Sequence, residues 1–243
     1  EKIPLPFDVA GAVGIKNQAQ FHPLKFIAAI AEGLPIYENT FVKEMRGNTA
    51  VTNSGSINAK AVIVTTHFPF INKHGSYFLK LYQHRSYVTA FENVKPVTGM
   101  YADEDKKGIS LRSYDGKLLV GGGSHRTGKQ GGAWEETEAF AKKYYPGASP
   151  ICQWAAQDCM SLDSMPYIGR YSKNTTDLYT ATGFNKWGIT SSMVSAMVLR
   201  DMIAGKENEW EGVFSPQRSI LKPQLLVNGF EATVNLLTPT KRR

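Results

Sequence analysis

The stretch TATGFNKWGITSSMVSAMVLRDMIAG, residues 180–205, decides the fold that the sequence predicts. Small and β-prone residues lead to Gly183, and a polar and aromatic turn follows as far as Gly188. The pattern predicts a strand, a glycine turn and a helix of about four turns. Because the first turn of a helix leaves backbone N–H groups unpaired and carries a partial positive charge, it is a candidate site for a phosphate, a carboxylate or an electron-rich ring. Apolar residues recur at helical spacing after the turn: Ile189, Met193, Ala196, Met197, Leu199 and Ile203.

The rest of the sequence predicts short strands and few helices. A helix is expected over residues 22–31, and Gly33 and Pro35 end it. Asp115-Gly116, between the runs ISLRSY and KLLVGGG, is the strongest hairpin signal of the chain. The other expected elements are β-rich runs over 36–45, 49–55 and 57–70, the last a buried strand ending at Thr66, a strand over 80–91, a helix over 134–145, strands over 151–157 and 178–181 with a turn around Pro166 between them, and a partly irregular tail from Phe214.

Composition limits the class of protein. With 243 residues and 42% hydrophobic content, the chain can bury one good-sized core or two smaller ones. No apolar run approaches the roughly 20 residues of a membrane-spanning helix, so we expect a cytoplasmic protein that binds no membrane. The two cysteines, Cys152 and Cys159, are too few for a disulfide framework and fit no common zinc spacing. A net charge of +7 would suit nucleic acid, but basic residues cluster only at 241–243, so a solvated surface is preferred.

Two further patterns are weak signals of chemistry. GSHRTGKQ, residues 123–130, nearly matches the phosphate-binding loop G-x-x-x-x-G-K-[ST], but Gln130 replaces the hydroxyl that would hold magnesium. We expect a flexible, ligand-facing loop there instead. No G-x-S-x-G elbow supports a hydrolase. Histidines without metal-site spacing are interpreted as core or surface residues: His67, His74, His84 and His125.

Four segments together resemble the glycine/D-amino acid oxidase family of FAD-dependent oxidoreductases. TGFNKWGIT and its following helix resemble the C-terminal flavin-binding signature. ICQWAAQDCMSLDSMPYIGR resembles the segment before that signature, with Asp163 and a P-x-I-G turn at 166–169. FHPLKFIAAIAEGLPIYENTFVKEM resembles the helix and strand that meet the adenine near Val42, and AVIVTTH resembles the strand whose end approaches the cofactor. The four segments occur in the family's order over nearly the whole chain, which makes the resemblance specific.

The resemblance implies a mixed α+β and α/β fold. It consists of a partial FAD-binding domain of the glutathione-reductase type, here 1–80 and 151–213, an antiparallel-sheet substrate domain, 81–150, and a strap or linker, 214–243. The family's opening strand and G-x-G-x-x-G turn bind the FAD pyrophosphate, and Gly11-Ala-Val-Gly14 has neither that spacing nor a preceding strand. We therefore expect the C-terminal portion of a longer oxidoreductase that lacks its first Rossmann segment.

Partners follow from the same resemblance. Relatives with the TGFNKWG wording often continue into a Rieske-type [2Fe-2S] domain, so the missing Rossmann segment and a C-terminal Rieske domain are both expected partners. This chain has no Cys-x-His pair and is expected to hold no cluster itself.

The resemblance also implies which residues would hold FAD. The helix start at Gly188, aided by Lys186 and Trp187, would stabilise negative charge on the reduced ring. Without the pyrophosphate turn, FAD binding by this chain alone is expected to be weak or absent. The expected cofactor-binding residues are Val42, Thr65, Thr66, Thr182, Gly183, Phe184, Asn185, Lys186, Trp187, Gly188, Ile189 and Thr190.

A departure from the family pattern suggests the substrate. Amino-acid oxidases of the family commonly place an arginine before the P-x-I-G turn to clamp the substrate carboxylate, whereas Gln157 and Asp158 stand here. An acidic group binds an ammonium and repels a carboxylate, so among amines and amino acids an amine is favoured as the substrate of C–N oxidation. Cys159 lies near where some relatives attach flavin through a thioether, but a plain buried cysteine is preferred. Two alternatives stay open: an inactive substrate- or partner-binding module without flavin, and a basic nucleic-acid binder.

Overall fold

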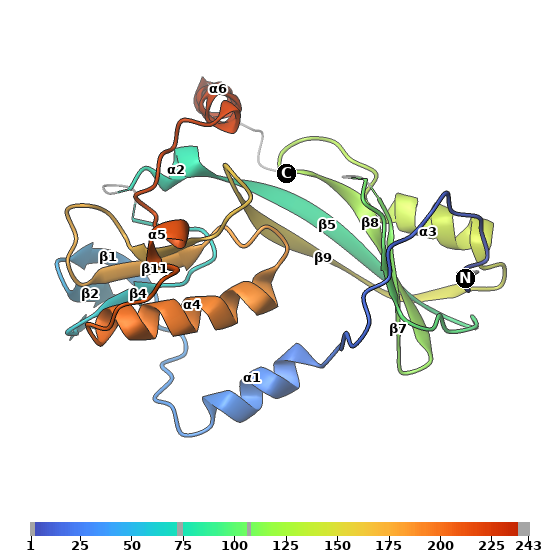
Figure 1. Cartoon of the computed structure of the whole chain (residues 1–243), viewed down its shortest axis with the longest axis horizontal. Helices are drawn as coiled ribbons and strands as arrows, with labels where there is room; N and C mark the ends of the chain where they lie inside the picture. The colour runs from blue at the N-terminus through green and yellow to red at the C-terminus, as the bar shows by residue number, and fades with distance from the viewer. Residues whose placement is uncertain (1–2, 72–74, 106–107, 238–243) are drawn as a thin grey trace.

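Two long strands connect two lobes of the molecule (Figure 1). The computed structural model describes residues 3–71, 75–105 and 108–237, so the expectations for His74 and for the basic end at 241–243 lie outside the described residues. The strands β5 (Leu81–Glu92) and β9 (Ser149–Ser161) pair antiparallel over almost their whole length. Within the described ranges, no helix is both long and apolar enough to cross a bilayer.

The first lobe contains a three-stranded mixed sheet in the order β10-β11-β4. β4 (Val62–Val64) runs parallel to β11 (Leu178–Thr182), and β10 (Tyr167–Arg170) pairs antiparallel with β11 on its other side. Helix α4 (Gly188–Ile203) covers one face of this sheet, and the short α5 (Glu211–Phe214) follows it. Since α4 begins at Gly188 and spans 16 residues, the predicted helix of about four turns is confirmed. The core between α4 and the sheet consists of Ile168, Tyr179, Ala181, Val198 and Leu199.

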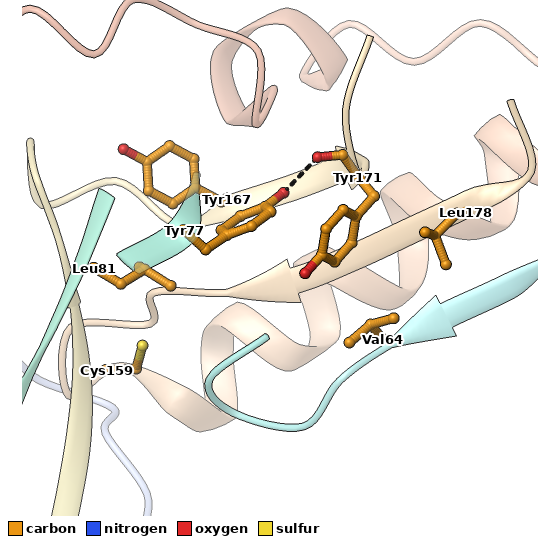
Figure 2. Close-up of a cluster of buried hydrophobic side chains, with 7 residues drawn as sticks. All are labelled: Val64, Tyr77, Leu81, Cys159, Tyr167, Tyr171 and Leu178. Atoms are coloured by element: carbon orange, nitrogen blue, oxygen red, sulfur yellow. Dashed lines mark hydrogen bonds between the residues drawn. The ribbon is translucent and has the colours of Figure 1, made fainter. Parts of the chain in front are cut away.

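The opposite face of the same sheet packs against the start of β5 and the short helix α2 (Tyr77–Lys80). Side chains alternate between the two faces of a strand, so Tyr167 and Leu178 lie in this core while their neighbours face α4. The Tyr77 hydroxyl donates a hydrogen bond to the carbonyl oxygen of Tyr171 at 2.9 Å (Figure 2). Figure 2 shows the whole cluster: Val64, Tyr77, Leu81, Cys159, Tyr167, Tyr171 and Leu178.

The N-terminal elements lie beside this lobe. Helix α1 (Pro23–Ala31) confirms the helix predicted over 22–31, although none of its residues is buried. A small antiparallel sheet follows, made of β1 (Val42–Arg46), β2 (Thr49–Thr52) and β3 (Ser56–Asn58).

The second lobe is a five-stranded antiparallel sheet in the order β6-β7-β8-β5-β9. Its other strands are β6 (Met100–Ala102), β7 (Ser110–Tyr114) and β8 (Lys117–Arg126), and α3 (Ala133–Tyr144) packs on one face. Asp115 and Gly116 both have positive φ, at 49° and 71°, as a two-residue type I′ hairpin turn requires. The predicted hairpin is therefore confirmed. The mixed fold class is confirmed as well, because one lobe combines parallel and antiparallel strands and the other is an antiparallel sheet. Strand β9 runs across residue 150, where the sequence places a domain boundary. The division into domains stays a prediction.

Three predictions of local structure need correction. The run over 57–70 splits into β3 and β4, and β4 ends at Val64, because the chain leaves one sheet and enters another between them. The P-x-I-G segment is not a turn beyond Pro166, since Tyr167–Arg170 form β10. Residues 123–126 belong to β8 rather than to a flexible loop, and only 127–130 turn away from the sheet.

The tail from Phe214 is also more regular than predicted. Helix α6 (Pro223–Leu237) forms most of its described part and packs on α2. Pro223 is the first residue of α6, where its missing N–H costs no helical hydrogen bond. Pro223 therefore starts a helix instead of keeping the chain irregular.

Candidate functional site

The parallel strands β4 and β11 end at the same edge of their sheet, next to a cavity. Their register pairs Val62 with Leu178 and Val64 with Thr180, and the Thr180 hydroxyl donates to the Val64 carbonyl at 2.9 Å. The cavity has a volume of about 620 Å³ and extends along α4. Four of the predicted cofactor residues line it: Thr65, Thr182, Gly183 and Phe184.

The turn between β11 and α4 is held by one buried side chain. Asn185 accepts a hydrogen bond from the Ser161 backbone N–H at 2.8 Å, and its own amide donates to the Gly183 carbonyl at 2.5 Å. Gly183, Asn185 and Lys186 have positive φ angles of 72°, 48° and 72°, a region that asparagine tolerates better than most residues. The Asn185 side chain thus fixes the turn and points into the protein, and its backbone N–H is bonded to the Cys159 carbonyl oxygen at 3.0 Å, so Asn185 stabilises the turn from inside.

The N-terminus of α4 lies on the surface. No side chain caps it, and a Cβ atom added at Gly188 would meet no heavy atom within 4 Å. Trp187 is 72% exposed, and Ile189 and Thr190 are exposed as well. Trp187 and Thr190 line a second, smaller cavity of about 170 Å³ beside the first helical turn. The unpaired backbone N–H groups of that turn therefore face open space.

Two predicted cofactor residues lie elsewhere. Val42 is the first residue of β1 and pairs with Thr52 in the separate three-stranded sheet, and it does not line the cavity at α4. Thr66 follows β4, and its hydroxyl donates to the Phe68 carbonyl at 3.0 Å. The structure thus gathers the residues near Gly183 and Gly188, and it leaves Val42 apart from them.

Three polar residues form a row across the five-stranded sheet. His84 on β5 pairs with Arg126 on β8 and with Asp158 on β9. Thr89 of β5 contacts Thr137 of α3 through their hydroxyl groups at 2.7 Å, which shows that odd-numbered side chains of β5 face α3. Because neighbouring residues of a strand alternate, the row of Arg126, His84 and Asp158 lies on the face opposite α3.

The two predicted substrate residues are separated by the same alternation. Asp158 belongs to the row, and the Ser86 hydroxyl donates to its carboxylate at 3.0 Å. Gln157 pairs with Arg85, so its side chain points to the α3 side of the sheet. Of the two predicted substrate residues, only Asp158 can therefore share a site with His84 and Arg126.

The turn before α4 lies beside the row, because the Asn185 N–H donates to the carbonyl oxygen of Cys159, the neighbour of Asp158, at 3.0 Å. Burial is the largest cause that lowers the pKa of His84, and the nearby Lys186 ammonium lowers it further, whereas the Asp158 carboxylate opposes both. His84 Nδ1 is buried and has no hydrogen-bond partner among the described residues. A neutral imidazole between two cations and one carboxylate is therefore available to hydrogen-bond a bound molecule.

The sequence pattern does not predict His84 and Arg126 as site residues. It favours a core or surface histidine at 84, and Arg126 falls within the near-match to the phosphate-binding loop. Cross-strand pairing brings them together, and a period-2 pattern alone does not reveal which strands are neighbours. Cys159 agrees with its sequence interpretation: it is a free, buried thiol, and burial raises its pKa.

Comparison with known proteins identifies the family. The family model described as FAD dependent oxidoreductase (DAO) matches residues 1–202. The chain belongs to this family. A Bacillus subtilis (strain 168) protein, YhfW, provisionally named a Rieske 2Fe-2S iron-sulfur protein, is 36% identical over 241 residues, which cover 92% of this chain and 47% of that protein.

Solved structures of family members share the fold of this chain. Glycine oxidase from Geobacillus kaustophilus superposes with a TM-score of 0.67 at 23% identity, covering 79% of this chain and 56% of that one. L-proline dehydrogenase from P. horikoshii gives 0.64 at 21% identity, covering 79% and 57%. The chain thus spans about half the length of the relatives that it matches.

Proposed function

We propose that this chain forms the substrate-binding and flavin-facing part of an FAD-dependent enzyme that oxidises a C–N bond of an amino acid or amine. The observation that carries the proposal is that the turn before α4 is bonded to β9 beside the row, through the Asn185 N–H and the Cys159 carbonyl oxygen at 3.0 Å. The turn before α4, with its uncapped helix start, lies next to the row formed by Arg126, His84 and Asp158. Each feature suits one of the two reactants.

The residues at the turn fit a flavin. Gly188 has open space where a side chain would stand, which permits close approach of a flat ring. The first-turn N–H groups of α4 and the Lys186 ammonium supply positive potential for a ring that gains negative charge, each worth on the order of 1 kcal/mol. FAD, when bound, accepts a hydride from the carbon that carries the nitrogen.

The adenosine and pyrophosphate part of FAD needs a further segment. β4 lies at an edge of its sheet, and its Ile63 is 43% exposed. Parallel sheets are normally covered and paired at such positions. The cavity beside β4 is lined by apolar and small side chains, among them Ala196, Leu199 and Ser195. We infer that a Rossmann strand, glycine turn and helix occupy this edge and groove in the intact enzyme, so that the 243-residue chain alone binds FAD weakly and is inactive.

The row suits a zwitterionic substrate better than a simple amine. Asp158 offers a carboxylate to an ammonium group, while Arg126 and Lys186 offer two cations to a carboxylate. Strands in a sheet lie about 4.8 Å apart, so Arg126 and Asp158 stand on either side of His84 at a separation that long side chains can bridge around a small amino acid. Arg126 supplies the cation that the segment before Pro166 lacks, which favours an amino acid over the amine inferred from the sequence.

The electron acceptor of the intact enzyme is proposed from the relative named as a Rieske protein. We propose that the intact enzyme shares that organisation, in which a [2Fe-2S] domain would accept the electrons of the flavin. This chain supplies no ligands to such a cluster, because it contains no Cys-x-His pair.

The test compares flavin binding and reduction in two polypeptides. The 243-residue chain and a version that carries a G-x-G-x-x-G Rossmann unit before residue 1 are titrated with FAD, and the second is mixed anaerobically with a panel of amino acids and their decarboxylated amines. We expect tight FAD binding only in the second and loss of the oxidised-flavin absorbance with at least one amino acid. Tight FAD binding without any reduction would favour the inactive binding module, and salt-sensitive binding of nucleic acid without flavin would favour the nucleic-acid binder.

A further inference from the structure

Helix α6 inserts one buried polar side chain between the lobes. Asn228 is 2% exposed, and its amide donates to the carbonyl oxygen of Leu79 at 3.0 Å. Its side-chain oxygen accepts from Arg126 at 3.1 Å and from Gln224, one turn earlier, at 3.0 Å. A helix near the C-terminus thereby reaches the strand β8, more than a hundred residues earlier in the sequence.

Arg126 is held on two sides by these contacts. Its guanidinium lies over the Tyr82 ring, 4.6 Å from the ring centroid, and one of its nitrogens donates to Asn228. Among the described residues, Asn228 is the only hydrogen-bond partner of the guanidinium. Since a guanidinium carries five N–H donors in a planar fork, the fork is oriented while most of its donors remain available to a ligand.

We propose that α6 positions Arg126 through Asn228, so that the guanidinium presents its free donors to the carboxylate of the substrate. This inference rests on the proposed function, because the carboxylate is that of the proposed amino acid. Asn228 acts as a positioning residue: it touches Arg126, whereas Arg126 contacts the substrate. Preorganisation of this kind lowers the entropy that ordering a long side chain costs on binding.

A second polar contact connects α6 to the segment after β8. Lys129, just after β8, forms an ion pair with Glu231 of α6 at 2.9 Å. The outer side of α6 is apolar and exposed, with Leu226 at 78% and Phe230 at 69%. The ion pair docks α6 on the segment after β8, whereas the Asn228 hydrogen bond acts directly on the Arg126 guanidinium.

The first experiment measures the freedom of Arg126 in the 243-residue chain, without flavin. The rate at which phenylglyoxal modifies Arg126 is followed by peptide mass spectrometry, with the exposed Arg170 as internal reference. We expect Asn228→Ala to raise the rate about fivefold, as loss of one hydrogen bond predicts, and Asn228→Asp to keep it within about twofold of wild type because the carboxylate still accepts from Arg126.

A matched variant separates Asn228 from the docking of α6 in general. Lys129→Gln removes the ion pair to Glu231 and leaves Asn228 in place, so the labelling rate of Arg126 should stay within about twofold. A wild-type rate in Asn228→Ala overturns the proposal. So does an equal acceleration in Lys129→Gln, because docking alone would then orient Arg126.

The second experiment uses the FAD-loaded enzyme with its Rossmann unit. For the best amino-acid substrate, Asn228→Ala should raise KM about tenfold with little change in kcat, and Asn228→Asp should restore KM. KM for the decarboxylated amine should not change. An enzyme that oxidises no amino acid refutes the proposed function, while the labelling result stands by itself. An enzyme that oxidises amino acids with an unchanged KM in Asn228→Ala refutes the positioning role alone.

Discussion

At the scale of single residues, Lys80 shows how strongly the first lobe constrains a charge. Its side chain is 7% exposed, and its ammonium donates to the Pro216 carbonyl oxygen at 2.7 Å. The ammonium also lies 5.0 Å from the ring centroid of Tyr77 and 5.7 Å from that of Tyr167. Burial, and to a lesser extent the Arg218 charge, lower the pKa of Lys80 to about 8. A single lysine thus connects the α2 end of the core to the segment that follows α5.

This burial predicts a specific pH dependence of stability. The ordinary pKa of lysine is 10.5, so between about pH 8 and pH 10 the unfolded chain binds more protons than the folded one, and stability rises with pH in that window. The unfolding free energy of wild type minus that of Lys80→Met should be constant below pH 8 and rise above it by about 1 kcal/mol per pH unit. Urea unfolding of both proteins at pH 7, 8.5 and 9.5 measures it, and the tyrosines that also titrate cancel in the difference. A difference that stays flat or falls would contradict the prediction.

At the scale of elements, local signals were predicted well and pairings were not. The Asp115-Gly116 turn and the helix after Gly188 depend on residues a few positions apart, and the sequence predicts both correctly. The row of Arg126, His84 and Asp158 depends on which strands are neighbours, and α6 depends on a buried contact of Asn228 with a distant strand. No local pattern encodes those contacts. The separation of Gln157 from Asp158 lies between these two cases. A predicted strand already places neighbouring side chains on opposite faces, but the pairing with other strands decides which face carries the site.

Substituting alanine for the two glycines of the turn before α4 should affect stability differently. Gly183 has a φ of 72°, and a Cβ there would lie 3.1 Å from Leu81, so Gly183→Ala should destabilise the chain by about 1–2 kcal/mol. Gly188 needs no positive φ and has open space around it, so Gly188→Ala should change stability by less than about 0.5 kcal/mol.

The same two alanine variants distinguish an effect on stability from an effect on FAD binding. In the enzyme with its Rossmann unit, Gly188→Ala should weaken FAD binding about tenfold or more, because the added methyl occupies space needed by the ring. Unfolding curves and FAD titrations of both variants provide the measurements. Unaltered FAD affinity in Gly188→Ala would show that the ring lies elsewhere.

At the scale of the whole molecule, the apolar surface is unevenly distributed. The second lobe has a covered core, whereas α1 has no buried residue, α4 leaves Met193 and Met197 about half exposed, and Ile63 on the edge strand β4 is 43% exposed. Exposed apolar surface that gathers on one side of a protein marks an interface. The proposed Rossmann unit accounts for the part of this surface along β4 and α4.

A charge placed on that surface tests its role. Ile63→Lys replaces an exposed side chain and should leave the stability of the 243-residue chain within about 0.5 kcal/mol of wild type. With the Rossmann unit attached, the buried ammonium should cost several kcal/mol and abolish FAD retention. Ile57→Lys, at a residue of β3 that is 48% exposed, is the matched control and should retain FAD. Equal FAD retention in the two variants would place the interface elsewhere.

The pairing of β4 with β11 has a consequence for the order of events during synthesis. The hydroxyl of Thr180 that closes onto Val64 belongs to a residue 116 positions later. At ribosomal speeds of about 5–20 residues per second, β4 waits on the order of 10 s for its neighbour, while the second lobe can already assemble. A nascent chain stalled before residue 178 would therefore hold β4 without its β11 partner, and the sheet of the first lobe could not close until residues 178–182 had been made.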